Sequence, residues 1–195
     1  MAKLKMSKIT HKLFYKRSAD IAGMLTITFM MFMFMNASLA NSRDHIDREQ
    51  QIKAVYLMHL VNYISWPNQF DMDGFVNICV YGNHPIGVHV KELEDKVINS
   101  MTLRISDNVQ MDKVVKCNIV FVGEDLEKTF TLEDGLNIAK DALVVGEGYD
   151  YIDNGGMLSF CIKENKVKIV INQAKIKNSD LKISSKLLRI AELVK

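Results

Sequence analysis

Two stretches of the chain carry runs of mostly apolar residues in place of a strict alternation of apolar and polar positions. Phe75–Tyr81 and Ile119–Val122 are rich in β-branched and aromatic residues, and a glycine follows each run. A continuous apolar run of this length is typical of a strand that is covered on both faces. The pattern therefore predicts two central strands in a sheet that lies between layers of helices.

Helices and further strands are predicted on either side of this pair. Helical periodicity covers Asp44–Ile64, and Trp66-Pro67 should end this helix, because proline restricts the residue before it. A second helix, capped by Asn83 or His84 and with Pro85 in its first turn, should reach about Val97. The other expected elements are strands over Met101–Ile105, Cys117–Val122 and Ala142–Val145, a helix over Glu124–Lys140, a hairpin of Met157–Ile162 with Val167–Asn172, and a last helix that is capped by Ser184 or Ser185 and has an apolar stripe of Leu187, Ile190, Ala191 and Val194.

The order of these elements predicts the fold class. Strands that alternate with helices and end in a hairpin are typical of an α/β protein. We expect a three-layer α/β/α sandwich with a mixed, mostly parallel sheet and a C-terminal hairpin and helix.

The first forty residues do not belong to that pattern. A basic leader precedes the uncharged stretch Ile21–Met35, and Ser38-Leu39-Ala40 supplies the small residues of a cleavage site. We expect residues 1–40 to be a secretory signal peptide and 41–195 to be a single domain in the periplasm. An uncleaved membrane anchor is the alternative, but Ile21–Met35 is shorter than the roughly 20 residues that a spanning helix needs.

Removing the leader changes the sign of the net charge. The whole chain has 25 basic and 23 acidic residues and a net charge of +2. The leader holds six of the basic residues and one of the acidic residues, which leaves 19 basic and 22 acidic residues and a net charge of −3. The exported part therefore carries no basic excess that would predict binding to nucleic acid.

The three cysteines are the clearest chemical feature of the exported part. Cys79 and Cys117 fall on the two central strands, and an oxidising compartment favours a disulfide between them. Two separately buried free thiols are the alternative, because sequence alone does not fix connectivity. Cys161 alternates with apolar residues in a predicted strand and is expected to be a buried, free thiol that acts as a small hydrophobe.

Other motifs do not assemble into a site. Gly82–Gly87 has the outline of a phosphate-binding loop but lacks the lysine and hydroxyl residue that follow it in such loops. His84 and His89 are five residues apart, a poor helical spacing for a metal, so capping or surface roles are favoured. We predict no catalytic residues, no cofactor and no metal, and we expect that the protein is not an enzyme.

Several segments together resemble the YfiR-like family of periplasmic proteins. The resemblance follows the chain in order over Lys53–Leu57, Tyr63–Pro67, Ile78–Gly82, Pro85–Gly87, Cys117–Gly123, Asn154–Phe160 and Leu181–Ala191. It implies a repressor that holds an inner-membrane diguanylate cyclase inactive by binding the cyclase's periplasmic domain, and so acts in cyclic-di-GMP signalling and biofilm regulation. It further implies that an outer-membrane lipoprotein relieves the inhibition, and that Cys79 and Cys117 are the disulfide positions of the family.

Two function classes follow from the sequence. The first is this protein-binding repressor, for which Trp66 and Phe70 are the candidate partner-binding residues, since aromatic groups near a helix end often anchor interfaces. Burial of Trp66 as a plug of the core is the competing interpretation. The second class is a small-ligand binding or sensor module, with a crevice at the strand ends marked by Gly82 and Gly123. Assembly as a homodimer is a further expectation.

Overall fold

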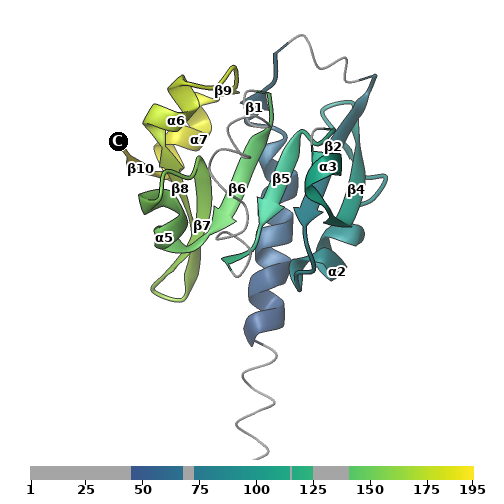
Figure 1. Ribbon diagram of the computed structural model, residues 1–195, viewed down its shortest axis with the longest axis horizontal. Helices are drawn as coiled ribbons and strands as arrows, with labels where there is room; N and C mark the ends of the chain where they lie inside the picture. The colour runs from purple at the N-terminus through teal and green to yellow at the C-terminus, as the bar shows by residue number, and fades with distance from the viewer. Residues whose placement is uncertain (1–44, 68–72, 115, 125–140) are drawn as a thin grey trace, which may run out of the picture. The chain divides into compact units, whose positions relative to one another are not determined.

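Eight strands form the central sheet in the part of the chain that the structure describes (Figure 1). The computed structural model describes residues 45–67, 73–114, 116–124 and 141–195, and the chain divides after Ile46 by its internal contacts. The strand order across the sheet is β10-β8-β7-β6-β5-β2-β4-β3. Along the chain these strands are β2 (Phe75–Tyr81), β3 (Val97–Ile98), β4 (Met101–Val109), β5 (Ile119–Val122), β6 (Leu143–Glu147), β7 (Leu158–Lys163), β8 (Lys166–Asn172) and β10 (Glu192–Val194).

The strand directions make the sheet mixed and mostly parallel, as predicted. Strands β4, β2, β5, β6 and β7 run parallel to one another in that order, and β10 runs parallel to β8. Among the described strands of this sheet, only the pairs β3–β4 and β7–β8 are antiparallel. The chain goes from β2 to β4 on one side and then to β5 on the other, so the strand order switches between β2 and β5.

Both faces of the sheet are covered, which explains the continuous apolar runs. In β5, Ile119 and Phe121 join one apolar cluster, whereas Val120 and Val122 join another. The first cluster also holds the helix over residues 45–60, α2 (Ile86–Lys91) and α7 (Ser185–Ile190). On the other face lie α3 (Met111–Val114) and α5 (Gly148–Asp153). This arrangement is the predicted three-layer sandwich, and Figure 1 shows the helix over residues 45–60 passing behind β5 and β6.

The first predicted helix is too long at its C-terminal end. The helix ends at residue 60, and Ile64–Ser65 form the short strand β1, which pairs with β9 (Lys182–Ile183). The backbone N–H of Ser184 also donates to the carbonyl of Tyr63 at 2.8 Å. Ile64 fits the helical period, so periodicity alone could not reveal that this residue pairs with a strand near the far end of the chain.

The second predicted helix and the strand after it also have different ends. Helix α2 stops at Lys91, and Val97, the predicted helix end, lies in β3. The chain takes a left-handed conformation at Asp95 (φ 61°), which breaks helical geometry before Val97. Strand β4 begins at Met101 as predicted but continues to Val109 rather than ending at Ile105.

The C-terminal hairpin is confirmed, and the last helix is shorter than predicted. Strands β7 and β8 pair antiparallel across Glu164 and Asn165, whose φ angles of 53° and 57° suit a two-residue hairpin turn. Ser184 caps α7 by accepting the N–H of Lys186 at 3.2 Å. The predicted apolar stripe is wrong, because α7 ends at Ile190 and Val194 lies in β10 beside β8.

Two remaining points concern helices. The sequence patterns gave no indication of α3, α5 or α6 (Gln173–Lys177), each of which has only four to six residues. The predicted helix over Glu124–Lys140 and the predicted signal peptide lie outside the described residues, apart from Glu124 itself. Within the described residues, no helix is long and apolar enough to span a membrane.

Candidate functional site

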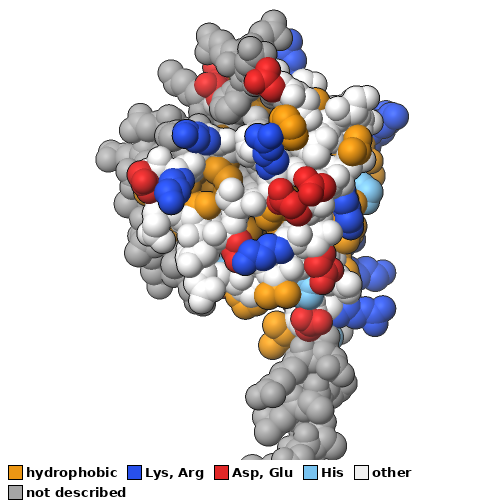
Figure 2. Space-filling model, turned by 90° about the vertical axis from the view of Figure 1, so that its right-hand side faces the viewer, with side chains coloured by type: hydrophobic (Ala, Val, Ile, Leu, Met, Phe, Trp, Pro, Cys, Tyr) orange, Lys and Arg blue, Asp and Glu red, His pale blue; other side chains and the backbone are white. Residues whose placement is uncertain are grey.

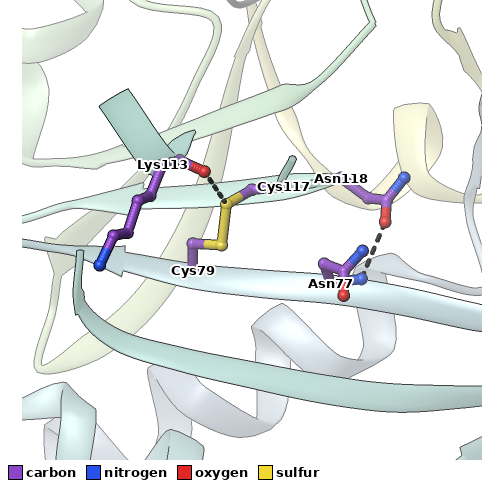
Figure 3. The surroundings of a disulfide bond; sticks show 5 residues. All are labelled: Asn77, Cys79, Lys113, Cys117 and Asn118. Atoms are coloured by element: carbon purple, nitrogen blue, oxygen red, sulfur yellow. Dashed lines mark hydrogen bonds between the residues drawn. A yellow bond between two sulfur atoms is a disulfide. The ribbon is translucent and has the colours of Figure 1, made fainter. Parts of the chain in front are cut away.

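A disulfide joins the two central strands at the amino end of β5 (Figure 3). Cys79 lies in β2 and Cys117 directly precedes β5, and their Cα atoms are 5.9 Å apart. Both residues are only 2% exposed. The pairing predicted from the sequence is thus present in the structure, and the alternative of two free thiols is wrong.

Asn118 adds a hydrogen-bonded clamp beside the disulfide. Its side-chain Oδ1 accepts the N–H of Asn77 at 2.8 Å (Figure 3). Its own N–H donates to the Asn77 carbonyl at 2.9 Å. The Asn118 carbonyl accepts two further bonds, from the N–H of Leu143 at 2.9 Å and from the indole N–H of Trp66 at 3.2 Å. A single buried residue therefore ties β2, β5, the start of β6 and Trp66 together.

This contact supports a structural role for Trp66. The side chain is partly buried against the main core cluster, and its one polar group is bonded to Asn118. Both features fit the interpretation that Trp66 plugs the core. Phe70 lies outside the described residues, so a partner surface made by Trp66 and Phe70 stays a prediction.

At the opposite, carboxyl edge of the sheet, two buried and two partly buried charged or titratable side chains lie together, which we call the ionic cluster: Lys53 and Glu147 are buried, and Glu49 and His84 are partly buried. Lys53 Nζ lies 2.6 Å from Glu147 Oε1 and 2.5 Å from Glu49 Oε1. His84 Nε2 lies 3.1 Å from Glu147 Oε2. The side chains of Lys53 and Glu147 are only 5% and 9% exposed. The cluster thus links the N-terminal helix, the loop after β2 and the last residue of β6.

The cluster keeps both of its central groups charged. Burial alone would raise the pKa of Glu147, but the hydrogen bond from His84 and the attraction of Lys53 outweigh burial and lower this pKa to about 2. Burial would likewise lower the pKa of Lys53, but Glu147 and Glu49 outweigh burial and raise it. Lys53 and Glu147 therefore form a buried ion pair at neutral pH.

His84 has a second contact, to the start of α2. Its Nδ1 accepts the N–H of Ile86 at 3.2 Å, and its carbonyl accepts the N–H of Gly87 at 3.0 Å. The His84 ring thus binds an N–H of the first turn of α2, but the N-cap residue is Pro85, so the prediction that Asn83 or His84 is the N-cap is wrong. Its ring packs against Phe121 with 5.2 Å between ring centroids. One imidazole thus connects α2, β5 and the ionic cluster.

Gly123 makes room for this imidazole at the end of β5. A Cβ atom on Gly123 would overlap Cδ2 of His84. The side chain of His84 therefore fills the space beside one of the two glycines where the sequence predicted a ligand crevice.

We expect Gly123→Ala to lower the free energy of unfolding by about 1–3 kcal/mol, the usual cost of forcing extra volume into a packed site. Urea denaturation followed by the fluorescence of Trp66, the single tryptophan, measures this change. The same substitution in a His84→Ala background is the control, because the overlapping ring is then absent. An equal loss in both backgrounds would contradict the proposed overlap.

His89 and Cys161, the other residues that the sequence analysis considered, lie in surroundings that indicate structural roles. His89 Nε2 lies 3.1 Å from Asp47 Oδ1, which ties the last turn of α2 to the N-terminal helix. Cys161 is a free, buried thiol, and burial raises its pKa, which keeps it protonated and unreactive. Within the described residues, no group of three or more His, Cys, Asp or Glu side chains could hold a metal ion.

The sequence analysis missed the ionic cluster, although one signal for it was present. Lys53 lies among the buried positions Ala54, Leu57 and Leu60 of the N-terminal helix. A lysine on an apolar helix face calls for a buried partner, because an unpaired buried charge is very costly. The partner, Glu147, is 94 residues away in the chain and could not be identified without the fold.

No large patch of basic side chains is visible on the face of the molecule that Figure 2 shows. Figure 2 shows one side of the molecule, on which basic and acidic side chains are interspersed with small apolar groups. One ion pair of the described residues is formed by Lys91 in α2 and Asp107 in β4, whose charged atoms are 2.8 Å apart. This face is consistent with the small net charge of residues 41–195.

The comparison with protein families decides the family. The sequence model described as YfiR/HmsC-like matches residues 50–192, which is most of the chain. The chain belongs to the YfiR/HmsC-like family. As a family, YfiR/HmsC-like proteins are periplasmic, non-catalytic regulators of cyclic-di-GMP signalling. The resemblance that the sequence segments indicated is therefore confirmed.

Other comparisons add little to this assignment. No curated protein sequence matches the chain. Among solved structures, the chain is similar to an ABC domain in complex with L-Trp from Streptococcus pneumonia, with 10% identity, a TM-score of 0.43, and coverage of 61% of this chain and 55% of that one. It is also similar to a conserved domain protein from Vibrio cholerae O1 biovar El Tor strain N16961, with 15% identity, a TM-score of 0.43, and coverage of 61% and 54%. The chain thus spans about half the length of these structures.

Proposed function

We propose that this protein is exported to the periplasm and represses an inner-membrane diguanylate cyclase by binding that enzyme's periplasmic domain. The observation that carries the proposal is the family match over residues 50–192. An outer-membrane lipoprotein that sequesters the repressor would relieve the inhibition. Assembly as a homodimer stays a prediction.

Three features of the chain support this proposal. The leader before Asn41 has the basic and uncharged stretches of an export signal. The disulfide between Cys79 and Cys117 suits an oxidising compartment. The buried polar groups at both ends of the central strands, Asn118 and the ionic cluster, are engaged in holding elements together. Such a scaffold suits a protein that acts through its surface.

We expect deletion of the gene to raise cellular cyclic-di-GMP, because the cyclase loses its repressor. Tagged protein, cross-linked and recovered from periplasm and inner membrane together, should bring down a membrane protein with a cyclase domain. Quantitative mass spectrometry measures both the nucleotide and the captured partner. Unchanged cyclic-di-GMP in the deletion strain, together with no captured cyclase, would contradict the proposal.

A single variant, Phe70→Ala, tests whether the predicted partner surface takes part in repression. Under the proposal, Phe70→Ala leaves the melting temperature unchanged but raises cyclic-di-GMP toward the deletion level. Ile190→Ala is a matched control, because it removes another large apolar side chain, one that is 70% exposed on α7. If Phe70→Ala behaves as wild type at normal protein level, repression does not use this surface.

A further inference from the structure

Helix α2 is held at both ends by histidines that face carboxylates. His84, just before α2, contacts Glu147 of β6, and His89, in its last turn, contacts Asp47 of the N-terminal helix. Histidine is the side chain that changes charge between about pH 5 and 8. Both attachments of α2 therefore involve a side chain of the type whose charge can change in that range.

The contacts of His84 fix which of its nitrogens carries the proton. Glu147 is ionised at neutral pH, because its pKa is lowered to about 2, so its Oε2 can only accept a hydrogen bond. His84 Nε2, 3.1 Å away, must therefore be the N–H donor. Nδ1 accepts the N–H of Ile86 at 3.2 Å and must therefore carry a lone pair. Both contacts are satisfied together only by the neutral imidazole with its proton on Nε2.

Protonation affects these two contacts in opposite ways. A proton taken from solvent onto Nδ1 turns that atom into a donor facing another donor, the N–H of Ile86, so this hydrogen bond is lost. The bond to Glu147 instead becomes charge-assisted and stronger. The imidazolium is thus drawn to the ionic cluster and withdrawn from α2.

We propose that His84 is a pH-sensitive latch: when neutral its ring accepts the N–H of Ile86 in the first turn of α2, and when protonated it releases this N–H while staying bound to Glu147. The released residue, Ile86, is fully buried and packs in the main core cluster, so the change loosens the edge of the core rather than the exposed surface alone. The inference concerns the fold itself and does not depend on which partner the protein binds.

The other charged groups around the latch keep the change local. Lys53, which also pairs with Glu49, balances the charge of Glu147 from the N-terminal helix. The backbone N–H of Glu124 approaches Glu147 Oε2 at 3.4 Å from the end of β5. At the far end of α2, protonation of His89 strengthens its pairing with Asp47. Lys91 pairs with Asp107 of β4. Acid therefore frees the N–H of Ile86 in the first turn of α2, while the last turn stays attached through His89 and Lys91.

Amide hydrogen exchange by NMR tests the latch in the wild-type protein. We expect the protection factor of the Ile86 amide to fall about fivefold between pH 7.5 and 5.5, the loss of a typical capping contact. Over the same range the melting temperature should stay nearly constant. Nitrogen-15 spectra should show that the neutral form of His84 carries its proton on Nε2.

Two substitutions separate the contacts of His84, because each amide mimics one ring nitrogen. His84→Asn places an acceptor near the position of Nδ1, so the Ile86 amide should stay protected at both pH values. His84→Gln places a donor near the position of Nε2, so the Ile86 amide should be weakly protected at both. His89→Gln is the control for the other end of α2 and should keep the wild-type pH response at Ile86.

Several outcomes would overturn the inference. Protection of Ile86 that does not change with pH in the wild type shows that there is no latch. The wild-type response in His84→Asn, or its loss in His89→Gln, assigns the response to another group. If either His84 variant fails to fold, a wild-type His84 that carries its proton on Nδ1 at pH 7.5 contradicts the inference by itself.

Discussion

Lys53→Met should lower the free energy of unfolding by about 3 kcal/mol, because it leaves the Glu147 carboxylate buried without its closest cation. Removing one member of a buried ion pair usually costs 3–5 kcal/mol, and the low end is expected here since His84 still contacts Glu147. For a domain of this size the loss corresponds to a melting temperature lower by about 10 °C. Urea and thermal denaturation measure both quantities.

The double variant Lys53→Met/Glu147→Gln provides the matched comparison. It removes both charges while keeping similar side-chain volumes, so it should recover part of the lost stability. Glu49→Gln should lower the free energy of unfolding by well under 1 kcal/mol. The Glu49 side chain is 21% exposed, and Lys53 still pairs with Glu147 in this variant. A double variant less stable than Lys53→Met would show that the cost comes from lost packing rather than from a buried carboxylate that has lost the ammonium group of Lys53.

The lowered pKa of Glu147 predicts that the stability of the protein depends on pH in the acid range. The folded-state pKa of Glu147 is lowered to about 2, below its ordinary value of 4.5. Such a group contributes stability that is fully present above about pH 4.5 and is lost as the pH falls toward 2. In Glu147→Gln this part of the acid dependence should disappear, so its stability should change less than that of the wild type between pH 5 and 2.5.

The central strands could be predicted from the sequence because burial on both faces leaves a strong pattern. All four residues of β5 are buried, and β2 was predicted with its observed limits. The hairpin of β7 and β8 was also visible, since its strands are separated by polar residues that suit a tight turn. The disulfide followed from placing one cysteine on each central strand.

The short edge elements could not be predicted, for a physical reason. Strands β1, β9 and β10 have two or three residues each, and pairing with distant segments stabilises them rather than local preference. Ile64 has the right spacing for the preceding helix, yet it pairs with Ile183. Val194 has the right spacing for α7, yet it pairs with Asn172 of β8.

The two candidate sites differ in the same way. The cysteine pair has a chemical signature of its own, whereas a glutamate at the end of a strand is common and acquires meaning only from Lys53 and His84. Those two residues reach Glu147 through the packing of the N-terminal helix and the loop after β2. The disulfide could therefore be predicted from the sequence, whereas the ionic cluster could not.

Cys79→Ala/Cys117→Ala should lower the free energy of unfolding by about 4 kcal/mol in the absence of reductant. In the chain-entropy model, a cross-link across a separation of 38 residues restricts the unfolded chain by about this amount. Alanine is the better replacement, since both sites are only 2% exposed and a serine would bury a hydroxyl. The fold should persist, because Asn118 still joins β2 to β5 through Asn77.

Reductant provides an independent measurement of the same quantity. Under reducing conditions the wild type should lose about the same stability as the double variant, whereas the double variant itself should not respond. Cys161→Ala tests the third thiol and should leave the response of the wild type to reductant unchanged, because Cys161 is buried and free. A wild type whose urea midpoint is the same with and without reductant, under conditions where mass spectrometry confirms reduction, would contradict a stabilising role for this bond. The comparison also bears on function, since a protein that depends on the disulfide for most of its stability should persist only in a compartment that keeps it oxidised.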